Sequence, residues 1–139
     1  MKKAAKLYFE KNQVPESVPT NSVAIKTQVK SDDFMLNPLN LIYAKSDGNY
    51  TEIHILKEEV VEKSLKRISI KELELQLNSV VTIVRTHRSY LVNINYLVKV
   101  TGNAQGYRLH LKKTDDLVPV SRNMIAQFEE HTKTLNTSA

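Results

Sequence analysis

The chain contains no cysteine, which excludes a disulfide framework, thiol catalysis and every metal site that depends on cysteine ligands. Glycine is almost as scarce, with three residues in 139, so a glycine-rich phosphate loop of the Walker type is absent. No apolar run approaches the roughly 18–20 residues that span a bilayer, and no signal-peptide core follows the first residues. We therefore expect a soluble, cytoplasmic protein.

Motifs for catalysis are missing as well. The histidines are scattered, and none has a second histidine or a carboxylate at ligand spacing on a predicted helix. The segment His87-Arg88-Ser89 superficially resembles a kinase catalytic loop, but serine stands where that loop needs an aspartate base. No Gly-x-Ser-x-Gly motif is present for a serine hydrolase. We expect no enzyme activity, no metal or other cofactor, and no small-molecule substrate.

What the chain does have is an uneven distribution of positive charge. The net charge is +5, and residues 80–123 hold seven basic residues against two acidic ones, including four of the five arginines. The planar fork of arginine suits phosphate oxygens and guanine edges, so this clustering favours a polyanionic partner. From charge alone, an exposed face that is simply solvated explains the pattern equally well.

Alternation of apolar and polar residues predicts short strands over most of the chain. In the last of them, Pro119 favours an edge position because proline cannot donate a ladder hydrogen bond. The expected strands cover residues 22–29, 34–36, 41–43, 50–56, 60–65, 80–85, 90–92, 96–101, 107–111 and 117–120.

Helices are predicted at three places. Ser69 and Glu72 form a capping box before a short helix that ends near Asn78. Ser121 is expected to cap a final helix that runs to about Leu135. A short helical start over residues 2–11 precedes a linker with two prolines.

The inventory of elements predicts a mainly β protein, built of antiparallel sheets with one short inserted helix and a C-terminal helix. Length and average composition allow one core, because 139 residues with 41% hydrophobic content suit a single domain. We expect an N-terminal segment over residues 1–21, the domain over 22–135 and a tail over 136–139.

Polar side chains at the ends of predicted strands are the candidate functional residues. Arginine can pair with guanine and asparagine with adenine, while histidine and tyrosine can contact bases or phosphates. Taken singly, each also has a structural explanation as a turn former, a solvated turn or a helix cap. The candidates are Asn49, Tyr50, His87, Arg88, Ser121, Arg122 and Asn123.

Four motifs in register resemble the LytTR family of bacterial DNA-binding domains. Residues 41–50 (LIYAKSDGNY) are similar to its opening strand and turn, and 64–77 to its short helix. Residues 83–93 (IVRTHRSYLVN) are similar to its central motif, and 118–123 (VPVSRN) to its closing strand-to-helix segment. The resemblance runs from about residue 22 to 135, roughly four-fifths of the chain.

The resemblance implies an elongated stack of small β-sheets whose loops enter successive major grooves at direct repeats and often bend the DNA. It assigns DNA contacts to all the candidates except Ser121, with Asn49 and Tyr50 in the most variable loop. Tyr90 and Asn93 are better explained as supports of the central loop. Affinity would come from phosphate contacts, for which Lys112 is a candidate.

The resemblance further implies a transcription regulator, with double-stranded promoter DNA as the partner and two copies acting as a homodimer or in tandem. Family members usually carry a receiver domain or a membrane-spanning sensor upstream, in two-component signalling, and neither is visible in residues 1–20. The alternative function is a basic protein-interaction module without sequence-specific DNA reading. RNA binding is disfavoured, because aromatic residues make up 6% of the chain and do not pair along one strand.

Overall fold

The computed structural model describes residues 22–138 and gives side-chain surroundings up to Lys133. Within this range the chain forms β1–β10 and the helices α2 and α3, joined in part by single 3-10 turns. The predicted N-terminal helix and linker lie outside the described residues. In the described part, no helix is long and apolar enough to cross a membrane.

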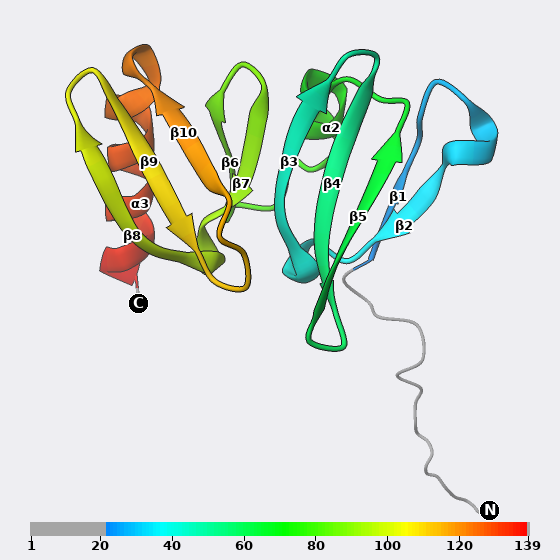
Figure 1. Ribbon diagram of the computed structural model, residues 1–139, viewed down its shortest axis with the longest axis horizontal. Coiled ribbons are helices and arrows are strands. Elements are labelled where there is room, and N and C mark those ends of the chain that lie inside the picture. The colour runs from blue at the N-terminus through cyan, green and yellow to red at the C-terminus, as the bar shows by residue number, and fades with distance from the viewer. Residues whose placement is uncertain (1–21, 139) are drawn as a thin grey trace, which may run out of the picture.

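A five-stranded antiparallel sheet forms the middle of the molecule, with the strand order β5-β4-β3-β7-β6 (Figure 1). Strand β3 pairs with β4 on one side and with β7 on the other, so segments far apart in sequence meet at β3. The strands of this sheet are β3 (Leu41–Asp47), β4 (Tyr50–Lys57), β5 (Val60–Lys66), β6 (Ile83–His87) and β7 (Tyr90–Asn93).

Two smaller sheets flank the middle one (Figure 1). The three-stranded sheet has the order β10-β9-β8, which places Pro119 on an edge strand and confirms that prediction. Its strands are β8 (Leu97–Asn103), β9 (Gly106–Leu111) and β10 (Leu117–Ser121), and the two-stranded sheet consists of β1 (Val23–Ile25) and β2 (Phe34–Leu36).

The first predicted strand is shorter than its alternation suggested, because β1 ends at Ile25 rather than at residue 29. The Asp33 carboxylate accepts hydrogen bonds from the Thr27 backbone N–H at 2.7 Å and from its hydroxyl at 3.1 Å. A 3-10 turn, Lys30–Asp32, follows. A side chain thus satisfies a backbone donor that would otherwise join a sheet ladder, which favours a turn.

The inserted helix α2 (Ile70–Gln76) begins as its capping box predicts, since the Ser69 hydroxyl oxygen accepts from the Glu72 backbone N–H at 3.0 Å. The final helix α3 (Ile125–Ser138) begins later than predicted. The Ser121 side chain does not cap α3 but donates to the Asn123 Oδ1 at 3.0 Å. A 3-10 turn, Arg122–Met124, separates Ser121 from the start of α3.

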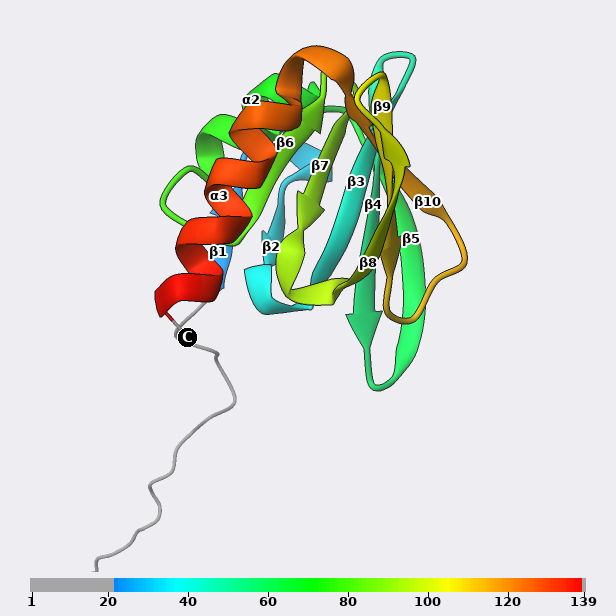
Figure 2. The ribbon, with the colours of Figure 1, turned by 90° about the vertical axis from the view of Figure 1, so that its left-hand side faces the viewer.

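Two hydrophobic cores lie on opposite faces of the five-stranded sheet. One packs α2, β1 and β2 against the sheet, and the other packs α3 and the three-stranded sheet against it. Strand β3 supplies both, because Leu41 and Ala44 belong to the first core and Ile42 and Tyr43 to the second. Each large apolar side chain so buried stabilises the fold by roughly 1.5–3 kcal/mol. The result is the elongated stack of small sheets that the sequence predicted (Figures 1 and 2).

Candidate nucleic-acid interface

Three turns between strands and the junction between β10 and α3 lie along one edge of the molecule, the upper edge in Figure 1, and they stay at the top when the molecule is turned in Figure 2. We call this the loop edge and define it by its turns, residues 48–49, 88–89, 104–105 and 121–124. The loop edge contains most of the candidate residues, and Tyr50 and His87 directly adjoin its turns. The topology therefore gathers on one side candidate residues that are up to 74 positions apart in the sequence.

The β3–β4 turn presents Asn49 as an exposed residue beside Gly48, whose φ of 62° is a conformation that glycine adopts without strain. The Ser46 backbone N–H donates to the Ser89 carbonyl at 2.8 Å, which fastens this hairpin to the β6–β7 turn. Asn49 and Arg88 are therefore carried by neighbouring, hydrogen-bonded turns.

Tyr50 has a partner that the sequence did not reveal. The Arg67 guanidinium stacks 4.9 Å from the centre of the Tyr50 ring, and its Nη2 donates to the Tyr50 hydroxyl at 2.6 Å. The pair brings a positive charge beside the first turn, because Arg67 directly follows β5 at the loop edge. Arg67 is thus a candidate contact that was missed, since only the β4–β5 pairing brings it close to Tyr50.

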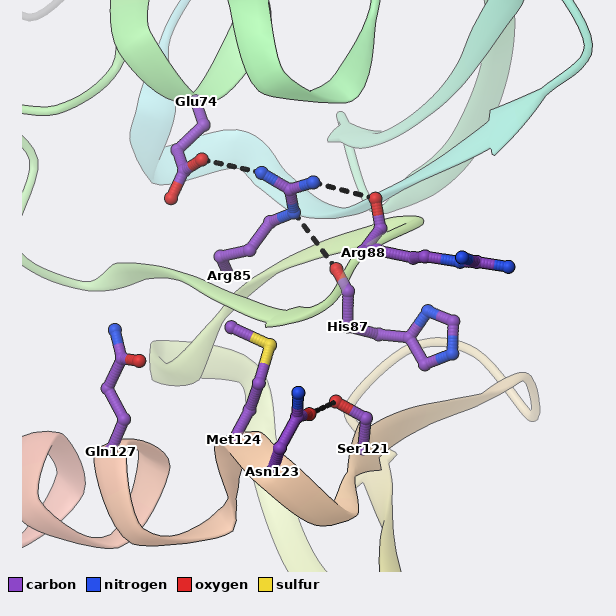
Figure 3. A pocket seen from close by; sticks show the side chains of 8 residues that line it. All are labelled: Glu74, Arg85, His87, Arg88, Ser121, Asn123, Met124 and Gln127. Atoms are coloured by element: carbon purple, nitrogen blue, oxygen red, sulfur yellow. Dashed lines mark hydrogen bonds and ion pairs between the residues drawn. The ribbon is translucent and has the colours of Figure 1, made fainter.

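Arg85 holds the β6–β7 turn from the side of α2 (Figure 3). Its Nε donates to the His87 carbonyl at 2.9 Å and its Nη2 to the Arg88 carbonyl at 2.7 Å. Its Nη1 donates to the Glu74 carboxylate of α2 at 2.6 Å, which ties the turn to the helix. One guanidinium thereby fixes two successive peptide groups of the turn, and the Arg88 side chain extends away from α2.

His87 has a defined tautomer when neutral. Its Nδ1 lies 3.1 Å from the Ser89 backbone N–H, which can only donate, so Nδ1 is the acceptor and Nε2 carries the proton. The ring packs edge-to-face on Tyr90, with ring centres 5.6 Å apart. His87 can therefore offer Nε2–H as a hydrogen-bond donor.

The junction between β10 and the 3-10 turn Arg122–Met124, which we label η4, faces the β6–β7 turn across a cleft of about 620 Å³ (Figure 3). Because Asn123 Oδ1 accepts from Ser121, the amide NH₂ of Asn123 is left as a donor. Arg122 is exposed between these two lining residues. The residues that line the cleft are Glu74, Arg85, His87, Arg88, Ser121, Asn123, Met124 and Gln127.

The structure thus brings four of the seven candidates, His87, Arg88, Ser121 and Asn123, into one cleft. Asn49 and Tyr50 lie in the adjoining β3–β4 hairpin, and Arg122 lies on the exposed side of η4. Among the side chains described up to residue 133, neither Arg88 nor Arg122 forms an ion pair. Both cations are therefore available to an external anion.

The supports of the central loop are confirmed. Asn93 is fully buried; its Nδ2 donates to the Pro38 carbonyl at 3.1 Å, and its Oδ1 accepts from the Asn95 backbone N–H at 3.0 Å. Tyr90 is half-buried between His87 and Tyr43. These side chains hold β7 and its turn in place.

Lys112 does not lie with the other candidates. It follows β9 in the β9–β10 connection, at the lower edge in Figure 1. A duplex laid along the loop edge would be a full strand length away from it. The interpretation of Lys112 as a backbone contact therefore does not fit the arrangement of the other candidates.

Comparison with known proteins agrees with this architecture. The family described as the LytTr DNA-binding domain matches residues 31–133. The sensory transduction protein LytT of Oceanobacillus iheyensis is 31% identical over 119 residues, which cover 80% of this chain and 47% of that protein. The chain thus spans about half the length of this curated relative.

A solved structure has the same fold. A LytTr DNA-binding domain from Bacillus cereus superposes with a TM-score of 0.61 at 21% identity, over 82% of this chain and 98% of that one. The family consists of DNA-binding domains and is not a class of enzymes. With its sheets stacked as in that structure and the family match spanning most of the domain, the chain belongs to the LytTR family of DNA-binding domains.

Proposed function

We propose that this domain binds double-stranded DNA sequence-specifically, as the output domain of a bacterial transcription regulator. The observation that carries the proposal is that Arg88 and Arg122, exposed and without ionic partners among the described side chains, stand on turns of a single edge. One duplex laid along this edge can contact both arginines. It could not do so if they stood on opposite sides of the molecule.

The chemistry of the loop edge matches the edges of base pairs in a major groove. Arginine donates two parallel hydrogen bonds to guanine O6 and N7, a contact worth about 1–3 kcal/mol of discrimination. The Asn123 amide, whose Oδ1 is already occupied by Ser121, keeps an NH₂ donor for a base acceptor. Arg88 and Arg122 are proposed to read bases, with His87, Asn49 and Asn123 beside them and Ser121 holding Asn123.

Placement of the reading groups depends on the rigidity of their turns. The turn that carries Arg88 is fixed by the Arg85 hydrogen bonds and by the bond from Ser46 to Ser89. A side chain on a braced turn loses less conformational freedom on binding, because its backbone is already in place. This preorganisation supports reading of bases over simple attraction to phosphates.

Two copies in tandem on direct repeats would supply enough contacts for selectivity, because one domain of this size touches few bases. The named sensory relative is about twice as long as the matched segment, which supports a role in signal transduction in which a receiver or a membrane sensor belongs to the same protein. We propose that the domain works in the cytoplasm, where promoter DNA is.

The test is selection from a random oligonucleotide pool, followed by gel shifts on the selected sequence and a scrambled one across a salt series. We expect a recurrent motif repeated in direct orientation, bound much more tightly than the scrambled sequence. Binding should weaken steeply with salt, because each neutralised phosphate releases counterions.

Equal binding of selected and scrambled DNA would overturn sequence-specific reading. Absence of binding even at low salt would instead favour the alternative, a basic surface that meets an acidic protein.

A further inference from the structure

The β8–β9 hairpin ends at the loop edge, although none of its residues is among the candidates. Its turn, residues 104–105, stands beside the β10–η4 junction in Figures 1 and 2. The strand register pairs Gly106 with Ser121, the residue before Arg122. A Cβ on Gly106 would lie 3.4 Å from the Val120 carbonyl oxygen, so the hairpin and β10 are in close contact there.

The hairpin turn has a fixed shape. Gly102 has a φ of 111°, which side chains rarely adopt, and a Cβ there would collide with the Gly106 carbonyl oxygen. Across the turn, Asn103 Oδ1 accepts from the Gln105 backbone N–H at 2.9 Å. The Asn103 side chain is therefore held in position by the turn itself.

Three side chains of the hairpin are exposed and lack partners for their donors among the described residues. The Asn103 NH₂ is left over from the turn, the Gln105 amide makes no hydrogen bond, and Arg108 forms no ion pair. The three lie along one groove of about 530 Å³. Amide side chains pair with adenine edges, and arginine binds phosphate or guanine.

The charge of the hairpin suits the same partner. Residues 97–111 contain no acidic residue, but they contain Lys99, Arg108 and His110. Strand pairing places Lys99 opposite His110 and Thr101 opposite Arg108, so the three basic side chains share one face of the hairpin. That face adjoins the loop edge and carries no negative charge that would repel a phosphate backbone.

We propose that the tip of the β8–β9 hairpin is a further DNA-reading element, an inference that rests on the proposed function. Asn103 and Gln105 contact base edges, and Arg108 neutralises a backbone phosphate. The tip stands one to two strand spacings of about 4.8 Å beyond β10. It therefore extends the recognised sequence by about one to three base-pair steps of about 3.4 Å on the side of Arg122.

The test uses the selected operator and a set of operators randomised one position at a time. The variants are Gln105→Ala and Asn103→Asp, and the second keeps the oxygen that accepts from Gln105 while removing the amide donor. We expect each variant to lose about five- to tenfold in base preference at about one to three positions beyond the Arg122 contact. Preference at the other positions should persist.

Arg108→Ala should weaken selected and scrambled DNA equally and reduce the dependence of log Kd on log salt by about one phosphate. Asn95→Ala is the matched control, because Asn95 is also an exposed asparagine but lies on the 3-10 turn Ile94–Tyr96 at the lower edge in Figure 1. It should leave binding unchanged. Equal Tm values for all variants separate contact from folding.

Unchanged base preference in both hairpin variants, with Arg88→Ala still defective, would overturn this inference and leave the proposed function intact. If the parent protein itself binds selected and scrambled DNA alike, the proposed function fails. A loss in Gln105→Ala, which adds no charge, that is uniform over all operator positions would assign the hairpin to the backbone and contradict base reading.

Discussion

The two edges of the molecule differ in whether their charged side chains have partners within the fold. At the loop edge, Arg88 and Arg122 have no ionic partner among the described side chains. At the opposite edge, formed by the turns at residues 37–40, 58–59, 94–96 and 112–116, three charged side chains have partners within the fold. Lys113 Nζ lies 2.8 Å from Glu59, and the Asp116 carboxylate accepts from the Tyr43 hydroxyl at 2.6 Å.

The difference indicates that the opposite edge holds the sheets together, while the loop edge is left to bind a ligand. Contacts at the opposite edge join the middle sheet to the three-stranded sheet. Glu59 and Tyr43 belong to the middle sheet and its turns, and their partners Lys113 and Asp116 lie in the β9–β10 connection of the three-stranded sheet. Hydrogen bonds at that edge hold the sheets in a fixed orientation. The orientation in turn sets the spacing of the turns at the loop edge, where a ligand must fit more than one turn at once.

The largest effect is expected for Arg88→Ala. Loss of a bidentate base contact costs about 1–3 kcal/mol, or roughly 5- to 150-fold in affinity for the selected operator. Arg88→Lys should recover binding to scrambled DNA but not selectivity, because lysine lacks the planar fork. Gel shifts on both DNAs measure this, and a variant with full selectivity would show that the cleft is not the reading site.

A smaller loss, about tenfold on the selected operator, is expected for Arg85→Ala. Arg85 acts on the DNA contact through the His87 and Arg88 carbonyls, because its Nε, Nη1 and Nη2 all donate within the protein. Its removal should lower the ratio of selected to scrambled affinity, because a mobile turn loses more conformational freedom on binding.

Glu74→Gln is the control for the Arg85 prediction, because it keeps a hydrogen-bond acceptor for Arg85 while removing the charge. We expect it to preserve most of the selectivity. A lower Tm in Arg85→Ala with an unchanged affinity ratio would reduce Arg85 to a purely structural role.

At the opposite edge, Tyr43→Phe should change stability and leave DNA affinity intact. The hydrogen bond from Tyr43 lowers the pKa of Asp116, and burial together with that bond raises the pKa of Tyr43. The stabilisation is therefore present above the unfolded Asp pKa of about 3.9, and it is lost as pH falls through the lower folded value.

The same stabilisation is also lost in alkali, as pH rises through the raised pKa of Tyr43. We expect Tyr43→Phe to reduce the free energy of unfolding by about 1–2 kcal/mol near neutral pH. The difference from the parent should shrink below about pH 4, where the unfolded Asp also takes up its proton. Denaturant unfolding at several pH values tests this, and a constant difference down to pH 2 would contradict it.

The smallest effect is expected for Lys112→Ala. The exposed side chain stands on the edge away from the reading turns, and surface charges beyond about 8–10 Å are largely screened at physiological salt. Affinity for selected and scrambled DNA should each change by less than about twofold. A large uniform loss would show that the duplex reaches this edge.

Local signals in the sequence predicted local structure well. The Ser69–Glu72 box, the turn around Gly48 and the edge position of Pro119 each involve neighbouring residues or one backbone property. The start of α3 was predicted too early, because Ser121 has an equally local alternative in bonding Asn123. Capping of the helix and donation to Asn123 are both short-range hydrogen bonds open to Ser121, and the residue types alone do not show which one forms.

The sequence by itself determined the strand-rich fold class, the family resemblance, and the residue types that can bind an anion. Only the tertiary structure decided how the cations are engaged, because Arg67 stacks on Tyr50 and Arg85 pairs with Glu74, 17 and 11 positions away. It also decided that Lys112 lies apart from Arg88 and that the β8–β9 hairpin stands beside Arg122. Alternation fixes which face of a strand a side chain occupies, but long-range pairing alone fixes which turns share an edge.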